Sequence, residues 1–261
     1  MAPPSSPARS FQADRLSVRI FATPEALAVA AAEDAAAVLR TALAARPRAR
    51  VILATGNSQL RFLEHLTQRS DLAWSRIEVF HMDEYLGMPA THPASFRRYL
   101  QERVVGRVKP AAFHGVEGDA LEPLSALRAY AAALAAAPID LCCLGIGENG
   151  HLAFNDPPVA DFTDPEAIKL VRLDEACRRQ QVGEGHFPNL DAVPAYAMTL
   201  TIPALCRAGR MIAVVPEARK AGAVQQALEG PVAPACPASF LRRQAHAALY
   251  LDTESSARLA R

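Results

Sequence analysis

The fold class is decided by the apolar stretch Ile139-Asp140-Leu141-Cys142-Cys143-Leu144 and by the turn that follows it directly, Gly145-Ile146-Gly147-Glu148-Asn149-Gly150-His151. A short apolar run that ends in a glycine-rich turn is typical of a strand buried on both faces of a parallel sheet. The same arrangement occurs earlier, where residues 50–54 lead into Thr55-Gly56-Asn57-Ser58 and then into a helical pattern. This repetition predicts an α/β fold with a mostly parallel sheet.

On either side of this stretch, short β-branched runs alternate with longer runs rich in alanine and leucine. We predict strands at residues 17–21, 50–54, 77–82, 139–144, 168–173, 197–200, 211–215 and 247–251. We predict helices at residues 24–45, 59–68, 93–104, 121–137 and 218–228, the first capped by Thr23. No repeat or linker interrupts the pattern, so we predict a single domain over residues 15–261 behind a flexible tail of residues 1–14.

The composition excludes several classes of partner. The chain of 261 residues has 28 basic and 27 acidic side chains, so neither nucleic acid nor an anionic membrane surface is a predicted partner. Charged residues interrupt the apolar stretches, and none is expected to span a membrane. Five cysteines without a Cys-x-x-Cys pair predict free thiols in a reducing, cytoplasmic compartment, with no disulfide and no metal site.

Polar residues gather at the ends of predicted strands, where an α/β sheet binds its ligands. The first cluster is Thr55, Gly56, Asn57 and Ser58, between a strand and a helix. Its backbone N–H groups and hydroxyls could hold a phosphate at the helix N-terminus. An ordinary helix cap at Ser58 is the alternative interpretation.

The second cluster is the acid pair Asp83 and Glu84, directly after the predicted strand 77–82. A carboxylate held beside a carbonyl group can move a proton between neighbouring carbons, as enolisation requires. The alternative is a solvated loop that caps a helix.

The third cluster centres on His151, which follows three closely spaced glycines. Glu148 and Asp156 are nearby acids that could orient its imidazole, and we predict a catalytic histidine. A fourth element, Arg219-Lys220 after the strand 211–215, is placed to grip a phosphate; a solvated helix start is the alternative.

Together these motifs resemble those of glucosamine-6-phosphate deaminases. The resemblance rests on Ala54-Thr55-Gly56-Asn57-Ser58, on His81-Met82-Asp83-Glu84-Tyr85-Leu86-Gly87 with His92-Pro93-Ala94-Ser95-Phe96, and on residues 145–157. It continues through residues 197–201 and 219–230 and covers roughly residues 17–252. It implies a Rossmann-like fold with helices on both faces of the sheet, shared with 6-phosphogluconolactonases and ribose-5-phosphate isomerases. It also implies chemistry without a metal or cofactor, a small-molecule sugar phosphate as partner, and a homo-oligomer.

The resemblance also implies a role for each site residue. Asp83 is the base that carries a proton between C2 and C1 of the opened sugar, and Glu84 supports the loop or the substrate. His151 assists opening of the pyranose ring, with Asn149 and Asp156 around it. The phosphate is held by a set that comprises Thr55, Gly56, Asn57, Ser58 and Lys220. The implied reaction converts an amino-hexose 6-phosphate to a ketose 6-phosphate with loss of ammonia.

The chain departs from the family pattern at certain positions. Many members have Asp and Glu where this chain has Asn149 and Asp156. Asn149 can hydrogen-bond the imidazole but cannot stabilise an imidazolium as a carboxylate does. A simple alignment places Gln181 where deaminases carry a phosphate-binding arginine, and Arg178 or Arg179 could substitute for it. These departures indicate a divergent branch of the family.

Other functions remain as alternatives. A 6-phosphogluconolactonase hydrolyses an ester and does not need a carboxylate poised over carbon, and the His-Leu-Ala-Phe-Asn run at residues 151–155 favours the deaminase. A non-catalytic sugar-phosphate sensor usually carries a helix-turn-helix segment, for which we expect the N-terminal tail to leave no room.

Overall fold

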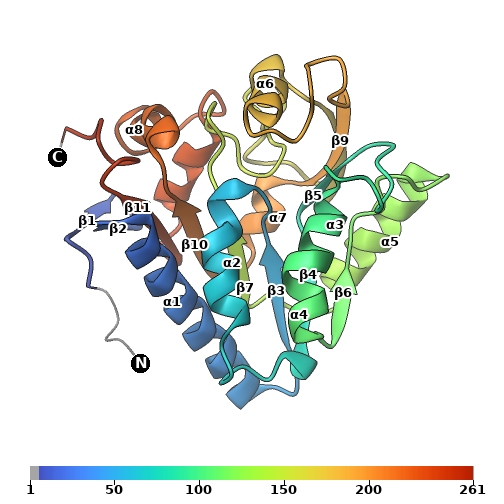
Figure 1. Cartoon of the computed structure of the whole chain (residues 1–261), viewed down its shortest axis with the longest axis horizontal. Helices are drawn as coiled ribbons and strands as arrows, with labels where there is room; N and C mark the ends of the chain where they lie inside the picture. Colours follow the sequence, from blue (N-terminus) through green and yellow to red (C-terminus); the bar gives the residue numbers. More distant parts are fainter. Residues whose placement is uncertain (1–5, 261) are drawn as a thin grey trace.

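A parallel sheet forms the centre of the computed structural model, which describes residues 6–260 (Figure 1). Its strand order is β1-β2-β11-β10-β7-β3-β4-β6, and every neighbouring pair is parallel except β1 with β2. The strands of this sheet are β1 (Arg9–Ala13), β2 (Leu16–Phe21), β3 (Ala49–Leu53), β4 (Ile77–His81), β6 (Ala112–His114), β7 (Leu141–Leu144), β10 (Arg210–Val215) and β11 (Ala247–Asp252).

Helices cover both faces of this sheet, which confirms the predicted fold class. One face packs against α1 (Pro24–Ala45), α2 (Leu60–Thr67) and the segment formed by α3 (Phe96–Leu100), a π-helical turn (Gln101–Val105) and α4 (Gly106–Val108). The other face packs against α5 (Pro123–Ala135), α7 (Ile202–Cys206) and α8 (Ala221–Glu229). Neighbouring residues on a strand point to opposite faces, and Cys142 and Cys143 of β7 accordingly belong to the two different cores.

A second, smaller sheet lies beyond the carboxyl ends of the central strands. It is antiparallel and consists of β5 (Asp83–Tyr85), β9 (Tyr196–Leu200) and β8 (Ile168–Arg172). The sequence analysis predicts β8 and β9 but assigns no strand to residues 83–85, and its alternative of a solvated loop there is wrong. Asp83 pairs with Thr199 in the ladder, a contact between distant segments that no local pattern reveals.

The start of α1 follows local rules. The side chain of Thr23 accepts a hydrogen bond from the backbone N–H of Ala26 at 3.1 Å, and Pro24 occupies the first helical position, as predicted. The helix expected to begin at Pro93 begins instead at Phe96, with Ser95 as its cap.

The predicted flexible tail of residues 1–14 needs correction. Residues 1–5 lie outside the described residues, but Arg9–Ala13 forms β1, which pairs antiparallel with β2 at the edge of the sheet. Such pairing uses backbone groups and needs no apolar pattern. The assignment of one domain stays a prediction. Among residues 6–260, no helix combines the length and apolar character needed to cross a bilayer.

Candidate active site

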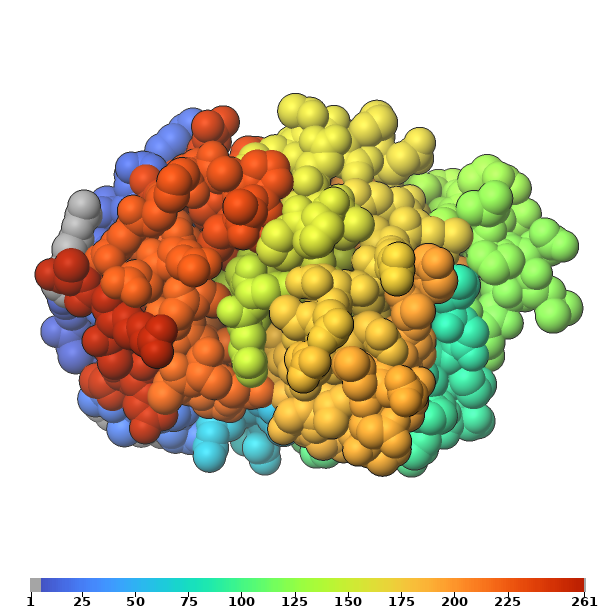
Figure 2. All heavy atoms as spheres, turned by 90° about the horizontal axis from the view of Figure 1, so that it is seen from above, coloured from blue at the N-terminus to red at the C-terminus, as the bar shows by residue number. Residues whose placement is uncertain are grey.

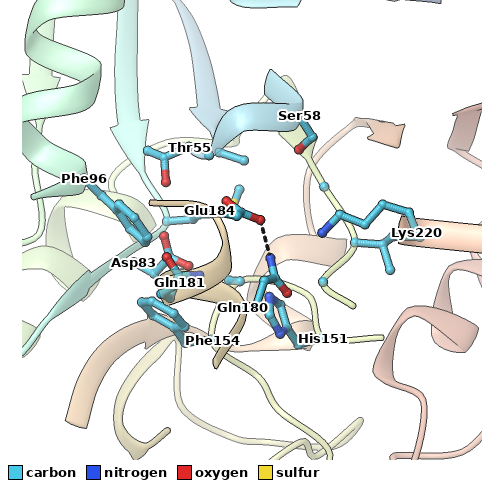
Figure 3. A pocket seen from close by; sticks show the side chains of 17 residues that line it. Thr55, Ser58, Asp83, Phe96, His151, Phe154, Gln180, Gln181, Glu184 and Lys220 are labelled. Carbon is cyan, nitrogen blue, oxygen red and sulfur yellow. Dashed lines mark hydrogen bonds between the residues drawn. The ribbon is translucent and has the colours of Figure 1, made fainter. Parts of the chain in front are cut away.

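Four adjacent strands of the central sheet, β10, β7, β3 and β4, end at one cavity. Residues that follow each of them line this cavity, among them Lys220, His151, Thr55 and Asp83 (Figure 3). The strand order reverses between β3 and β7. From β3 the chain adds β4 and β6 toward one edge of the sheet, and from β7 it adds β10 and β11 toward the opposite edge. Ligands of open α/β sheets bind at such a reversal. The expectation that the polar clusters share one edge is confirmed.

Asp83 lies on β5 at the wall of the cavity, and its backbone is held by the ladder with β9. The residue is only 5% exposed. Burial, together with the neighbouring charge of Glu84, raises the pKa of Asp83 well above its usual value. A carboxylate with a raised pKa is a stronger base than an ordinary one.

Glu84 does not line the cavity, so the substrate-binding role predicted for it is corrected. Its buried carboxylate accepts hydrogen bonds from the hydroxyl of Ser95 at 2.7 Å and from the backbone N–H groups of Phe96 and Arg97 at 3.2 and 2.9 Å. These are the free N–H groups at the start of α3. Glu84 therefore anchors the segment beside Asp83, which is the loop-supporting role named as its other possibility.

His151 faces the cavity and lies close to an acid, although its Nδ1 has no partner of hydrogen-bond geometry among the described residues. Its Nδ1 lies 3.1 Å from Oδ1 of Asp156, a residue with no exposed surface. Burial acts to raise the pKa of Asp156, but its contacts with His151 and Asn149 lower that pKa overall. A carboxylate at Nδ1 fixes the tautomer and orientation of the ring. Of the two acids predicted to do this, Glu148 instead approaches Arg219, 3.4 Å away.

Asn149 acts on Asp156 and on the backbone, so the predicted bond to the imidazole is absent from the described contacts. Its Nδ2 donates to Asp156 at 3.0 Å, and its Oδ1 accepts from the backbone N–H of His151 at 3.1 Å. Neither Asn149 nor Asp156 lines the cavity. Both are positioning residues rather than the catalytic residues predicted.

The turn between β3 and α2, which the sequence analysis predicts as a phosphate cradle, lies at the cavity. Thr55, Gly56 and Ser58 line the cavity, and Gly56 has φ +97°, a conformation that favours glycine. Asn57 is absent from the cavity lining; its side chain donates to the backbone carbonyl of Glu184 at 3.4 Å, and its contact with phosphate stays a prediction. Lys220 is 3% exposed and closes the other side of the cradle.

Glu184 is a cavity residue that the sequence analysis misses. It directly follows α6 (Glu175–Gly183), and its side chain is 5% exposed. The arginines proposed as substitutes in this segment lie elsewhere, because Arg178 donates to backbone carbonyls and Arg179 pairs with Glu175 at the surface. Gln181 does line the cavity, where its Oε1 accepts from the Tyr85 hydroxyl at 2.8 Å.

Two aromatic side chains were also missed, although both stand inside the quoted motifs. Phe96 and Phe154 line the cavity and stack on each other, with centroids 5.6 Å apart. They form an apolar wall beside Asp83 (Figure 3), and such a wall limits the access of water to the carboxylate.

The family model described as glucosamine-6-phosphate isomerases/6-phosphogluconolactonase matches residues 22–250. The chain belongs to this family. Among its relatives, the glucosamine-6-phosphate deaminase of Pseudarthrobacter chlorophenolicus is 36% identical over 230 residues, which cover 86% of this chain and 87% of the relative. The enzyme of the same name from an Arthrobacter species is 35% identical and covers 87% of this chain and 88% of the relative.

Solved structures agree with this placement in the glucosamine-6-phosphate isomerase/6-phosphogluconolactonase family. A monomeric glucosamine-6-phosphate deaminase superposes with a TM-score of 0.84 at 28% identity, covering 92% of this chain and 98% of the other. A 6-phosphogluconolactonase from Shewanella baltica has a TM-score of 0.73 at 21% identity, covering 93% and 99%. The second likeness shows the shared fold alone.

One group of side chains in this family member could hold a metal ion. Donor atoms of His151, Asp156 and Cys177 all lie within 4.8 Å of one another. Burial, followed by the charge of Asp156, raises the pKa of the Cys177 thiol well above its usual value, which opposes the thiolate that a metal needs. The sequence predicts no metal, and this stays a prediction.

Gly147 provides the space for the histidine ring. A Cβ at this position would lie 2.2 Å from Cε1 and Nε2 of His151, so alanine must displace the ring from Asp156. We expect Gly147→Ala to lower kcat by about 100-fold, since a misplacement of about 1 Å has that effect. The control is Gly183→Ala, where a Cβ meets no atom within 4 Å. Unchanged kcat in Gly147→Ala would show that turnover does not depend on this ring position.

Proposed function

We propose that this family member is a glucosamine-6-phosphate deaminase, which converts an amino-hexose 6-phosphate and water to a ketose 6-phosphate and ammonia. The observation that carries the proposal is a buried carboxylate of raised pKa, Asp83, in one cavity with an oriented histidine and a phosphate cradle. The names of relatives that are 36% and 35% identical support it.

The proposed reaction begins at the sugar ring. His151 handles the proton of the ring oxygen, which opens the pyranose to the aldehyde. Lys220 and the turn of Thr55 to Ser58 hold the phosphate at the other end of the chain, since a helix start and an ammonium group both attract anions. Binding at two ends places C1 and C2 against Asp83 and thereby lowers the entropic part of the barrier.

Asp83 then moves one proton. It takes the proton from C2, whose electrons form the double bond to C1 while the aldehyde oxygen takes a proton from solvent, which gives an enolamine. Asp83 then returns its proton to C1 as the nitrogen lone pair forms the C=N bond. The product is an imine at C2. Water adds to this imine and the C–N bond then breaks. Ammonia is released, and the ketone remains at C2. The overall chemistry is an aldose–ketose isomerisation combined with deamination.

The raised pKa of Asp83 supports its role as base. A proton on carbon is weakly acidic, and proton transfer is faster when the base has a higher pKa, provided that the base remains ionised at the working pH. Ester hydrolysis by a 6-phosphogluconolactonase removes no proton from carbon, so that reaction does not require a base placed beside a carbon atom.

The test is the release of ammonia from purified protein given glucosamine 6-phosphate, with fructose 6-phosphate measured in parallel. We expect the two products in equal amounts. The matched control substrate is 6-phosphogluconolactone, which should not be hydrolysed above the spontaneous rate. Hydrolysis of the lactone without release of ammonia would overturn the proposal and favour the lactonase.

We also propose a reducing compartment such as the cytoplasm. Within residues 6–260, which include all five cysteines, no disulfide forms and all thiols are free. Association into a homo-oligomer stays a prediction from the family resemblance; the solved deaminase with a TM-score of 0.84 is described as monomeric. Sedimentation of the purified protein decides between the two states.

A further inference from the structure

The phosphate cradle contains a carboxylate of the chain itself. Oε1 of Glu184 accepts hydrogen bonds from Arg219 and from Gln180, both at 2.8 Å. Figure 3 shows the Glu184 carboxylate inside the cavity, between Thr55 and Lys220. A Cβ added to Gly56 would lie 4.0 Å from Oε2 of Glu184, so the acid faces the turn that is built to receive an anion.

This carboxylate is charged at neutral pH. Burial acts to raise the pKa of Glu184, but His186, Arg219 and Lys220 together lower it to about 2. Its side chain is 5% exposed, so water screens it weakly. A second anion placed against the same cations meets a like charge, which opposes its binding.

Glu184 reaches the cavity from the outer side of the molecule. Figure 2 shows α6 and the loop after it, in gold, on the upper face beside the yellow-green segment that follows β7. The backbone of Glu184 is tied to the cradle through Asn57. The acid is thus held in place from the turn, from α6 and from Arg219.

We propose that Glu184 competes with the phosphate of the substrate for the cradle, and that Arg219 is the second cation that the phosphate gains when it displaces this carboxylate. The identity of the phosphate-bearing ligand rests on the proposed function. Arg219 precedes Lys220 in the same turn after β10 and does not line the cavity. It pairs with Glu217 at 2.6 Å, with Glu184 at 2.8 Å and with Glu148 at 3.4 Å. It provides the positive charge that Gln181 lacks.

Such competition makes the site selective. A ligand that binds through phosphate alone must displace Glu184 with that one contact, whereas a sugar phosphate adds contacts along its whole chain. Inorganic phosphate should therefore bind weakly to the wild-type protein, and the carboxylate should be the reason for it.

The experiment measures the Kd of inorganic phosphate by titration calorimetry on the full chain. We expect Glu184→Gln, which keeps the shape and removes the charge, to tighten binding at least tenfold. The matched control is Glu175→Gln, an acid at the exposed start of the same helix, which should leave the Kd unchanged. An unchanged or weaker Kd in Glu184→Gln would overturn the proposal.

The role of Arg219 is tested in the Glu184→Gln background. Adding Arg219→Gln should remove most of the tenfold gain, while Arg219→Lys, which keeps the charge, should retain part of it. A gain that survives Arg219→Gln would overturn the role of Arg219. If Glu184→Gln does not fold, Glu184→Asp, which withdraws the carboxylate by one methylene, should give a smaller gain, and no gain would again overturn the proposal.

These measurements need no turnover. If the protein is not a deaminase, it will release no ammonia, while the Kd of inorganic phosphate can still respond to Glu184→Gln. Conversely, a fully active deaminase whose Kd does not respond would remove only the competition by Glu184. The two proposals therefore fail separately.

Discussion

Replacing Asp83 with asparagine is expected to abolish exchange of the C2 proton with solvent and to lower kcat by about 10⁴-fold, the upper range for loss of a general base. Asparagine has nearly the same shape and keeps the backbone pairing of Asp83 with Thr199. The cradle lies at other strand ends, so binding of a phosphate-bearing ligand should persist. Loss of exchange with retained binding is the result that assigns the base.

A change in protein stability should not explain the loss of activity in Asp83→Asn. Because burial raises the pKa of Asp83, the charged form is disfavoured in the folded state, and the folded protein gains nothing from ionising this group above the unfolded pKa. A neutral asparagine should leave the Tm equal or higher. The control is Asp161→Asn, an exposed acid outside the cavity. Equal proton exchange in Asp83→Asn and wild type would remove Asp83 from the mechanism.

The wild-type pH profile checks the same assignment. A base works only when ionised, so kcat/KM should fall as the pH drops through the pKa of Asp83 in the free enzyme. Since that pKa is raised, the acid limb should lie well above 3.8, the ordinary value for an aspartate. An acid limb near the ordinary value would indicate that another group is the base.

Replacing Lys220 with alanine is expected to raise the Kd of phosphorylated ligands by about 10- to 100-fold, because a hydrogen bond to a charged group contributes about 1.5–3 kcal/mol to binding. Lys220 is 3% exposed, and among the described residues no other lysine lines the cavity. Dephosphorylated sugars lack the group that Lys220 binds, and their weak binding should not change.

The measurement is the ratio of Kd values for fructose 6-phosphate and fructose. Lys109→Ala, at an exposed lysine outside the cavity, should leave that ratio unchanged. Lys220→Ala also removes a cation from beside Glu184, so the double variant Lys220→Ala/Glu184→Gln restores the charge balance of the cradle. A ratio that is the same in wild type and in both Lys220 variants would exclude Lys220 from the phosphate site.

The secondary structure near the site could be predicted because its signals are local. Thr23 and Pro24 mark the start of α1, and the glycine-rich turns mark the ends of β3 and β7. The acid pair stands directly after a predicted strand, and His151 stands at the end of the glycine-rich turn that follows another. Their meeting at one cavity follows from the rule that parallel strands present their carboxyl ends at one edge.

The roles of individual acids and amides could not be predicted in the same way. Glu84 anchors the start of α3 through the backbone N–H of Phe96, which is 12 residues away in the sequence. Asn149 binds Asp156 instead of the imidazole, although all three residues stand in one motif. Which oxygen meets which donor depends on how the backbone turns, and a motif does not specify that.

The amino-acid sequence by itself determined the α/β class, most strands and helices, and the identity of Asp83, His151 and Lys220 as site candidates. These depend on periodicity, capping and glycine turns, which act within a few residues. Only the tertiary structure decided that β1 and β5 are strands and that Glu184 lines the same cavity as Thr55 and Lys220. The pairing of Glu184 with Arg219 spans 35 positions and that of Tyr85 with Gln181 spans 96. Such contacts form only when the packed sheet and helices bring distant segments together, so no local pattern contains them.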